Sequence, residues 1–350
     1  MRVPVPALVA VWLATVPLAC RPQPVDRDPH ERVRLSFFAL GDTGAVPSGM
    51  GRALDTQMRV AAVLDAEQRR RPADALVLLG DNFYPDGLRE AELALRVREN
   101  LVRPYCAFLA LDGPASAGVA DACEPARRAD HPVPIYAVLG NHDFDLPESP
   151  KLQREAVPRF VPSWHVPSGP VEVVELADID LVPSASLILY EPETLADRGD
   201  AAALERALRE AHGPWRILAG HFPVDDQFPG PWIRRTLDAI DVPVQLHLSG
   251  HEHNLQIGAP PSGDPALVAV AGSGSSARPI RHRVEGSRFA LEEPGYARVD
   301  LVGDGAAERL VVSLVAVPNL PEAIWNAPRV VQRWSVGLDG DVREEALDDE

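Results

Sequence analysis

The feature that most constrains this chain is a repeated arrangement of apolar runs, each followed at once by a glycine and then by polar side chains. The clearest case is the run Ala75–Leu79, which reads as a buried parallel strand and leads into Gly80-Asp81-Asn82-Phe83-Tyr84. In open α/β sheets, residues just beyond the carboxyl end of a strand point into the ligand crevice. Asp81 and Tyr84 are therefore placed for chemistry, although Gly-Asp-Asn alone is also ordinary turn composition.

Four other apolar runs end in the same way. They lead into Gly41-Asp42-Thr43-Gly44, Gly140-Asn141-His142-Asp143, Gly220-His221-Phe222-Pro223 and Gly250-His251-Glu252-His253-Asn254. A strand over 34–40, a helix over 50–71 and the strand over 75–79 form a βαβ unit, which brings Asp42 and Asp81 to neighbouring strand ends. A single histidine after a glycine is weak evidence for a metal ligand. Five such loops in one α/β pattern indicate one site.

The remaining periodicity completes an α/β fold. Further strands are predicted over 133–139, 171–176, 186–190, 215–219 and 244–248, and at 329–336 in the tail; further helices are predicted over 88–101, 201–212 and 232–240. Three more runs, 267–271, 297–302 and 310–317, are expected to complete a second sheet. The prediction is a two-sheet β-sandwich flanked by helices, with a site at the carboxyl ends of the strands.

The polar side chains of these loops suit a pair of metal ions. Two cations a few ångströms apart repel each other, so an anionic ligand must bridge them, and an aspartate is the natural bridge. Hard oxygen donors such as Asp42 and Tyr84 suit a trivalent ion, whereas imidazole and amide donors suit a softer divalent one. Such a pair lowers the pKa of bound water and holds the oxygens of a phosphoryl group during in-line displacement.

The five loops resemble the signature of the calcineurin-like metallophosphoesterases, and more narrowly that of purple acid phosphatases of the small tartrate-resistant type. The resemblance covers roughly residues 35–317. The wider superfamily has a histidine at the place of Gly44, and purple acid phosphatases have instead a tyrosine at the place of Tyr84.

The resemblance implies a specific set of metal ligands. Ferric iron, Fe(III), would be held by Asp42, Asp81, Tyr84 and His253, with tyrosinate-to-iron charge transfer giving a purple colour. The second ion, ferrous iron, zinc or manganese, would be held by Asp81, Asn141, His221 and His251, so that Asp81 bridges. His142 would bind the phosphate and protonate the leaving group, while Asp143 would fix its orientation.

The function implied is hydrolysis of small phosphate monoesters by metal-activated hydroxide, as in an acid phosphatase. A phosphodiesterase or nucleotide hydrolase on the same site is the first alternative, because members of the superfamily differ in the rim of the site. Glu252 adds negative charge near the mouth of the site. A non-catalytic surface protein that keeps the fold as a binding scaffold is the second alternative, and the full set of ligands argues against it.

Charge limits the partners. Lys+Arg 34 against Asp+Glu 51 gives a formal net charge of −17, which disfavours binding of a nucleic-acid backbone by bulk charge. A monomer is expected. The domain is expected to span 33–318, followed by a C-terminal extension over 319–350 with an acidic end.

The first residues predict export. An apolar stretch over 3–19 follows Arg2 and is too short and too proline-broken for a membrane span, so residues 1–20 read as a signal peptide and 21–32 as a flexible linker. The segment resembles a lipoprotein signal in which Cys20 carries a lipid anchor, although plain cleavage stays open. A periplasmic or cell-surface location is expected. Cys106 and Cys123 then form an even pair in an oxidising compartment, either as a disulfide or as two free thiols.

Overall fold

The structure is a computed structural model, and it describes residues 32–45, 55–177, 183–303 and 308–347. The predicted signal peptide, Cys20 and nearly all of the predicted linker lie outside the described residues. So do residues 50–54 of the first predicted helix. Within the described ranges, no helix has both the length and the apolar character needed to cross a membrane.

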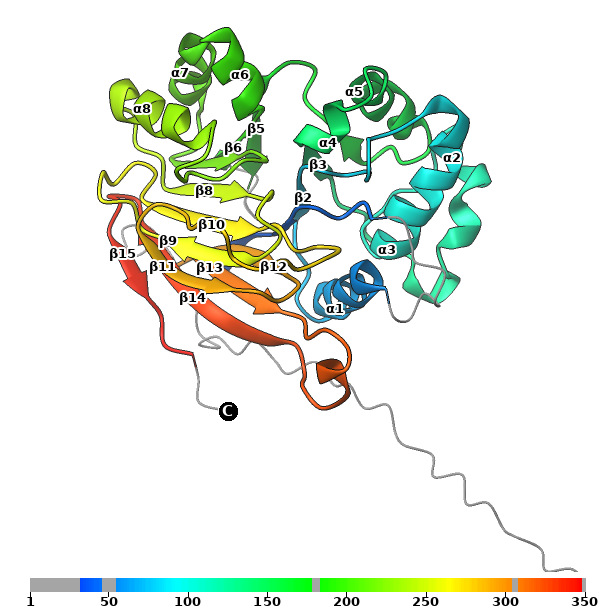
Figure 1. Ribbon diagram of the computed structural model, residues 1–350. Helices are drawn as coiled ribbons and strands as arrows, with labels where there is room; N and C mark the ends of the chain where they lie inside the picture. Colours follow the sequence, from blue (N-terminus) through cyan, green and yellow to red (C-terminus); the bar gives the residue numbers. More distant parts are fainter. Residues whose placement is uncertain (1–31, 46–54, 178–182, 304–307, 348–350) are drawn as a thin grey trace, which may run out of the picture.

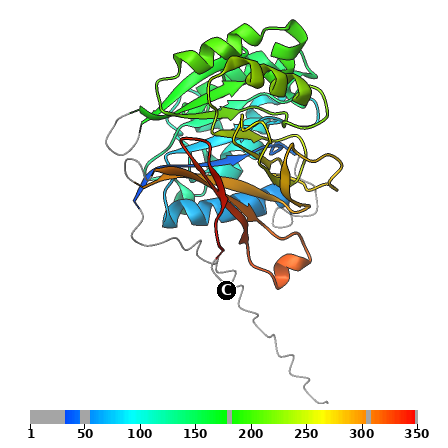
Figure 2. The same cartoon turned by 90° about the vertical axis from the view of Figure 1, so that its left-hand side faces the viewer.

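Two β-sheets lie face to face, with helices outside each of them (Figure 1). The first sheet has the strand order β15-β14-β13-β12-β1-β2-β3-β4, and the second has the order β11-β9-β10-β8-β7-β6-β5. Seen from the side, helices α6–α8 cover one face of the sandwich and α1 lies on the opposite face (Figure 2). The predicted two-sheet sandwich with flanking helices is confirmed.

The elements have the following bounds. The first sheet contains β1 (Val33–Leu40), β2 (Ala75–Leu79), β3 (Ile135–Val138), β4 (Trp164–His165), β12 (Gly295–Val302), β13 (Arg309–Ala316), β14 (Arg329–Gly337) and β15 (Val342–Glu344). The second contains β5 (Val171–Ala177), β6 (Pro183–Tyr190), β7 (Trp215–Ala219), β8 (Leu246–Ser249), β9 (Leu255–Gly258), β10 (Leu267–Ala271) and β11 (Ser287–Leu291). The helices are α1 (Thr56–Arg70), α2 (Leu93–Arg96), α3 (Arg103–Tyr105), α4 (Asn141–Phe144), α5 (Ser149–Lys151), α6 (Pro192–Arg198), α7 (Ala201–Glu210) and α8 (Gly230–Ile240).

The central strands of the first sheet are largely apolar because the sheet is buried on both faces there. In β1, Phe37 and Ala39 pack between the two sheets, whereas Phe38 and Leu40 pack outward in the same cluster as Leu64 of α1. Successive side chains of a strand alternate between faces, so a strand covered on both sides needs an unbroken apolar run. A third cluster joins the second sheet to helices α6–α8.

The assignment of two strands to the second sheet is wrong. The runs predicted at 297–302 and 310–317 form β12 and β13, and β12 pairs antiparallel with β1 in the first sheet. The strand predicted at 329–336 is confirmed as β14, which pairs with β13, so the tail contributes to the first sheet. An apolar run carries no local signal for which sheet it joins, because that depends on which strand edge is free after the chain returns.

The second predicted helix is longer and less regular than expected. Helical structure runs from Glu90 to Tyr105 as a 3₁₀ turn, α2, a π-helical segment (Val97–Val102) and α3. Strands β9 and β11 and helix α6 were not predicted, because short segments give little periodicity.

Cys106 and Cys123 form a disulfide with Cα atoms 5.3 Å apart, which decides between the two alternatives for this pair. The two cysteines are 17 residues apart in the sequence. Both are buried in the same hydrophobic cluster as Tyr105 of α3. A cross-link of this span restricts the unfolded chain, which stabilises the folded state by about 3 kcal/mol in the chain-entropy model.

Replacing both cysteines by alanine should therefore lower the free energy of unfolding by about 3 kcal/mol. Urea unfolding of the two proteins, each with and without reductant, measures this difference. Reductant should weaken the parent protein and leave the double variant unchanged. Equal midpoints for the parent and the variant would show that the bridge contributes nothing.

Candidate metal centre

The loops that carry the predicted site contain strained backbone. Asp42 (φ 58°), Asp81 (φ 53°), His251 (φ 67°) and His253 (φ 29°) are non-glycine residues with positive φ. Such conformations cost of order 1–3 kcal/mol each and persist where the surrounding structure holds them, most often at functional sites. Here all four lie directly after β1, β2 or β8, at the carboxyl ends of these strands.

The first cluster of donor atoms gathers around the phenol of Tyr84. Its Oη lies 2.6 Å from Asp42 Oδ1, 2.8 Å from Asp81 Oδ2 and 2.9 Å from His253 Nε2. His253 Nε2 is also 3.1 Å from Asp42 Oδ1. These are the four side chains predicted to hold the ferric ion.

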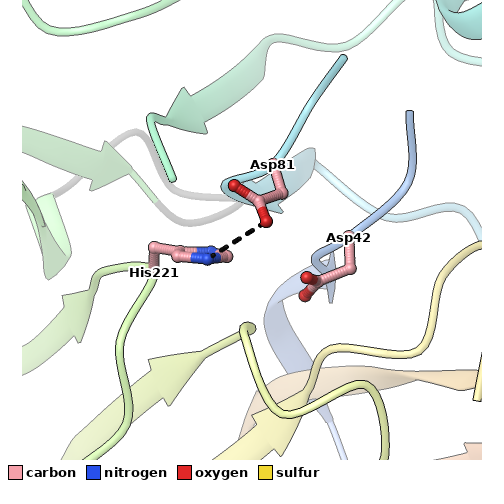
Figure 3. Close-up of side chains that lie close together, drawn as sticks. All are labelled: Asp42, Asp81 and His221. Atoms are coloured by element: carbon pink, nitrogen blue, oxygen red, sulfur yellow. Dashed lines mark ion pairs between the residues drawn. The ribbon is translucent and has the colours of Figure 1, made fainter. Parts of the chain in front are cut away.

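The second cluster gathers around His221. Its Nε2 lies 3.2 Å from Asn141 Oδ1, 3.3 Å from His251 Nδ1 and 3.5 Å from Asp81 Oδ2. These are the four side chains predicted to hold the divalent ion. Figure 3 shows Asp42, Asp81 and His221, which come from three separate segments, facing one another.

Asp81 belongs to both clusters through the same oxygen, Oδ2, while its Oδ1 accepts a hydrogen bond from the backbone N–H of His142 at 3.0 Å. One ligand atom each from Asp42, Asp81 and His221 lie within 4.8 Å of one another. The structure thus brings all seven predicted ligands together and puts the predicted bridging residue between the two groups.

The buried carboxylates of the site favour the binding of cations. Asp42 and Asp81 are 0% and 1% exposed, and their ion pairs within the described residues are with His253 and His221, not with lysine or arginine. Burial alone would raise the pKa of Asp42, but the hydrogen bond and charge of His253, with the charge of His221, lower it to about 2. Burial, followed by the charges of Asp42 and Asp81, raises the pKa of the Tyr84 phenol far above its usual range. A multivalent cation reverses this effect on a phenol that binds it, so the donor set fits a metal pair.

Partners outside the clusters fix which histidine nitrogen is free. His221 Nδ1 lies 2.8 Å from the Leu79 carbonyl and His253 Nδ1 lies 2.8 Å from Ser276 Oγ, which leaves Nε2 of each ring for the cluster. Burial and the charge of His221 lower the pKa of His251 to about 3, so this ring stays neutral, the form that binds metals. Such outer partners orient ligands and raise their basicity.

Ser276 was missed from the sequence. It lies in the loop after β10, where Gly272-Ser273-Gly274-Ser275-Ser276 follows an apolar strand in the same pattern as the five motif loops. The loop is tied to the site a second time, because Ser275 Oγ donates to the Asp42 carbonyl at 2.5 Å. The pattern of strand, glycine and polar residues therefore also marks this sixth loop.

Gly44 and Tyr84 are packed as a pair. A Cβ at position 44 would lie 2.0 Å from the Asn82 carbonyl oxygen and 2.5 Å from the Phe83 nitrogen. The close approach lets the Tyr84 N–H donate to the Gly44 carbonyl at 3.0 Å. A histidine at position 44 is thus incompatible with the loop packing that brings the Tyr84 phenol into the first cluster.

His142 stands at the edge of the two clusters. Its ring lies 4.8 Å from the Tyr84 ring, centroid to centroid, and its side chain is 35% exposed. Nδ1 lies 2.6 Å from the Pro85 carbonyl and 3.2 Å from Asp145 Oδ2. The ring is therefore oriented by Pro85 and Asp145.

Asp143 has a different position from the one expected. Its buried carboxylate accepts hydrogen bonds from the backbone N–H groups of Asn82 and Gly140 and from Gln153 Nε2, at 2.8–3.2 Å. Burial, then the charge of Asp81, raises its pKa to about 6. These contacts connect the Asp81 loop to the His142 loop through their backbones, so Asp143 holds His142 only indirectly.

Comparisons with known proteins agree with this geometry. A family model described as Calcineurin-like phosphoesterase matches residues 35–255. Tartrate-resistant acid phosphatase type 5 of Rattus norvegicus is 25% identical over 245 residues, covering 63% of this chain and 67% of that protein. The Mus musculus protein of the same name is 24% identical over 272 residues, covering 71% and 73%.

Two solved structures share the fold. GAP50, "the anchor in the inner membrane complex of Plasmodium", superposes with a TM-score of 0.56 at 16% identity, covering 85% of this chain and 89% of that one. PhoD superposes with a TM-score of 0.55 at 11% identity, covering 90% and 72%. Since the family model spans more than half of the sequence and all five motif loops, the chain belongs to the calcineurin-like phosphoesterase family, with distant similarity to the tartrate-resistant acid phosphatases.

Proposed function

We propose that this protein is an exported acid phosphatase that hydrolyses small phosphate monoesters with a pair of metal ions, Fe(III) and a divalent iron, zinc or manganese ion. The observation that carries the proposal is the arrangement of seven donor side chains in two clusters that share Asp81 Oδ2. Tyr84 in the first cluster supports the ferric ion, because a phenolate oxygen is a hard donor.

The proposal extends to location and assembly. The apolar stretch before Cys20 supports export, with a lipid anchor on Cys20 as the membrane attachment, and the Cys106–Cys123 disulfide supports an oxidising compartment. We propose that the enzyme works in the periplasm or at the cell surface as a monomer. The formal charge of −17 supports a small substrate over a nucleic acid.

Two bound metal ions supply Lewis-acid polarisation of the ester and a water of lowered pKa. The protein supplies the proton for the leaving group. When Nδ1–H of His142 donates to the Pro85 carbonyl, Nε2 is free to hold a proton and give it to the departing alkoxide oxygen. The backbone N–H of His142 donates to Asp81, which keeps the ring at a fixed distance from the clusters.

A phosphodiester is the second candidate substrate, and Glu252 is the observation in its favour. This half-buried carboxylate lies within electrostatic reach of Asp42 and His253, and burial raises its pKa against the opposing effect of His282. Its charge repels a monoester dianion more strongly than a diester monoanion. Comparing kcat/KM for one monoester and one diester of the same alcohol decides between them.

Replacing His142 by alanine should lower kcat by about 10²–10⁴-fold for alkyl phosphates and much less for nitrophenyl phosphate. A nitrophenolate departs without a proton, whereas an alkoxide needs one. Steady-state kinetics on a series of leaving groups measures this difference. His165→Ala is the matched control, because His165 pairs with Glu172 away from the two clusters. Equal losses across the series would remove His142 as the general acid.

A further inference from the structure

Arg96 is a buried arginine at the end of α2, where the helix passes into the π-helical segment Val97–Val102. Its residue exposure is 7%, and burial lowers its pKa. The ion pairs of the described residues include no partner for it. The charges of Glu92 and Asp143 act against the effect of burial on this pKa. A buried charge is costly unless it is also hydrogen-bonded, so the hydrogen bonds of Arg96 matter.

The guanidinium donates to the backbone of both ligand-bearing loops. Nη2 donates to the Tyr84 carbonyl at 2.6 Å and to the Gly44 carbonyl at 3.2 Å. Nε donates to Asn100 Oδ1 at 2.7 Å, and Asn100 Nδ2 donates to the Ala45 carbonyl at 2.9 Å. Together the side chains of Arg96 and Asn100 donate to three backbone carbonyls, those of Gly44, Ala45 and Tyr84.

Those loops carry the first metal cluster. Tyr84 supplies the phenol, and Gly44 lies two residues after Asp42, whose Oδ1 is 2.6 Å from that phenol. No side chain at position 44 bridges the loops, because the space for a Cβ there is filled by Asn82. Arg96 therefore adds, from a separate helix, a link between the two loops beside the direct bond from the Tyr84 N–H to the Gly44 carbonyl.

We propose that Arg96 is a positioning residue of the metal centre: it holds the Tyr84 loop against the Gly44 loop and thereby keeps the phenol beside the Asp42 carboxylate. The inference rests on the proposed role of Tyr84 and Asp42 as metal ligands. A planar guanidinium can donate to two carbonyls and an amide at fixed angles, which a lysine ammonium on a flexible stem does not reproduce.

The test is Zn²⁺ binding by the metal-free protein, measured by titration against a competing chelator, so it needs no turnover. Arg96→Met and Arg96→Lys should each weaken by about 10–100-fold the Zn²⁺ site that Tyr84→Phe also weakens, as loss of an outer partner of a metal ligand does. The melting temperature of the metal-free protein should change by less than about 4 °C. If the methionine variant does not fold, the Zn²⁺ affinity of the lysine variant tests the proposal, since lysine keeps the buried charge.

Arg98→Met is the matched control. Arg98 lies two residues further along and pairs with Glu99 and Asp121 at the surface, so its loss should leave Zn²⁺ affinity unchanged. Unchanged affinity in both Arg96 variants, or an equal loss in Arg98→Met, would overturn the positioning role while the metal centre stands. Absence of Zn²⁺ binding by the unsubstituted protein would instead overturn the metal centre and the inference with it.

Discussion

Asp81→Asn should reduce the bound metal from two ions per chain to one or fewer and lower kcat for a phosphate monoester by more than about 100-fold. Asp81 Oδ2 lies 2.8 Å from Tyr84 Oη and 3.5 Å from His221 Nε2, so it is the atom that both clusters share. Without the negative charge of Asp81, the two metal cations would repel each other with no anion between them. Substitution of an outer partner alone typically costs 10–100-fold, so loss of a shared ligand should cost more.

Metal content by elemental analysis and single-substrate kinetics measure this effect. The amide is nearly the same size as the carboxylate, so the fold should be kept. Asp86→Asn is the matched control, because Asp86 is partly exposed and its ion pair is with Arg89, outside the two clusters. Two metal ions and normal turnover in Asp81→Asn would show that Asp81 bridges nothing.

Asp143→Ala should lower the free energy of unfolding by about 3–5 kcal/mol. The carboxylate is 0% exposed and accepts hydrogen bonds from the backbone of Asn82 and Gly140 and from Gln153. Alanine would leave these buried donors without acceptors, and each unsatisfied buried group costs about 1–3 kcal/mol. Urea unfolding of the metal-free protein measures the loss without a contribution from bound ions.

Asp145→Ala is the matched control for stability. Asp145 lies two residues later with its side chain 53% exposed, and its contact in the structure is with the His142 ring. Its loss should change the free energy of unfolding by less than about 0.5 kcal/mol. Similar unfolding curves for the parent and Asp143→Ala would contradict the account of Asp143 as a buried acceptor that joins the two loops.

The sequence was sufficient for the parts of the site that local rules govern. A buried strand gives a continuous apolar run, and the glycine after it permits close packing: a Cβ on Gly140 would lie 2.2 Å from Asp81 Oδ1. Asp42, Asp81 and Tyr84 are therefore predicted at neighbouring strand ends from their positions alone. In the structure, one carboxylate oxygen of Asp42 and one of Asp81 lie within 2.8 Å of the Tyr84 phenol oxygen.

What the sequence did not reveal depends on contacts between distant residues. Strand β12 pairs with the free edge of β1, which lies about 260 residues earlier in the chain, and β13 pairs with β12; neither pairing has a local signature. Arg96 contacts backbone carbonyls, and a carbonyl gives no residue type to search for. Asp143 and Asp145 are equivalent by composition near His142, and only the turn after Gly140 decides which one faces the imidazole ring.

The most direct test of the central claim is the metal content of the oxidised protein, measured together with its visible absorption spectrum. Two metal ions per chain including iron are expected, with a broad charge-transfer band that Tyr84→Phe abolishes. A protein that holds iron and stays equally purple in Tyr84→Phe would contradict the assignment of Tyr84. A colourless parent protein holding zinc or manganese alone would keep the family and contradict the iron centre.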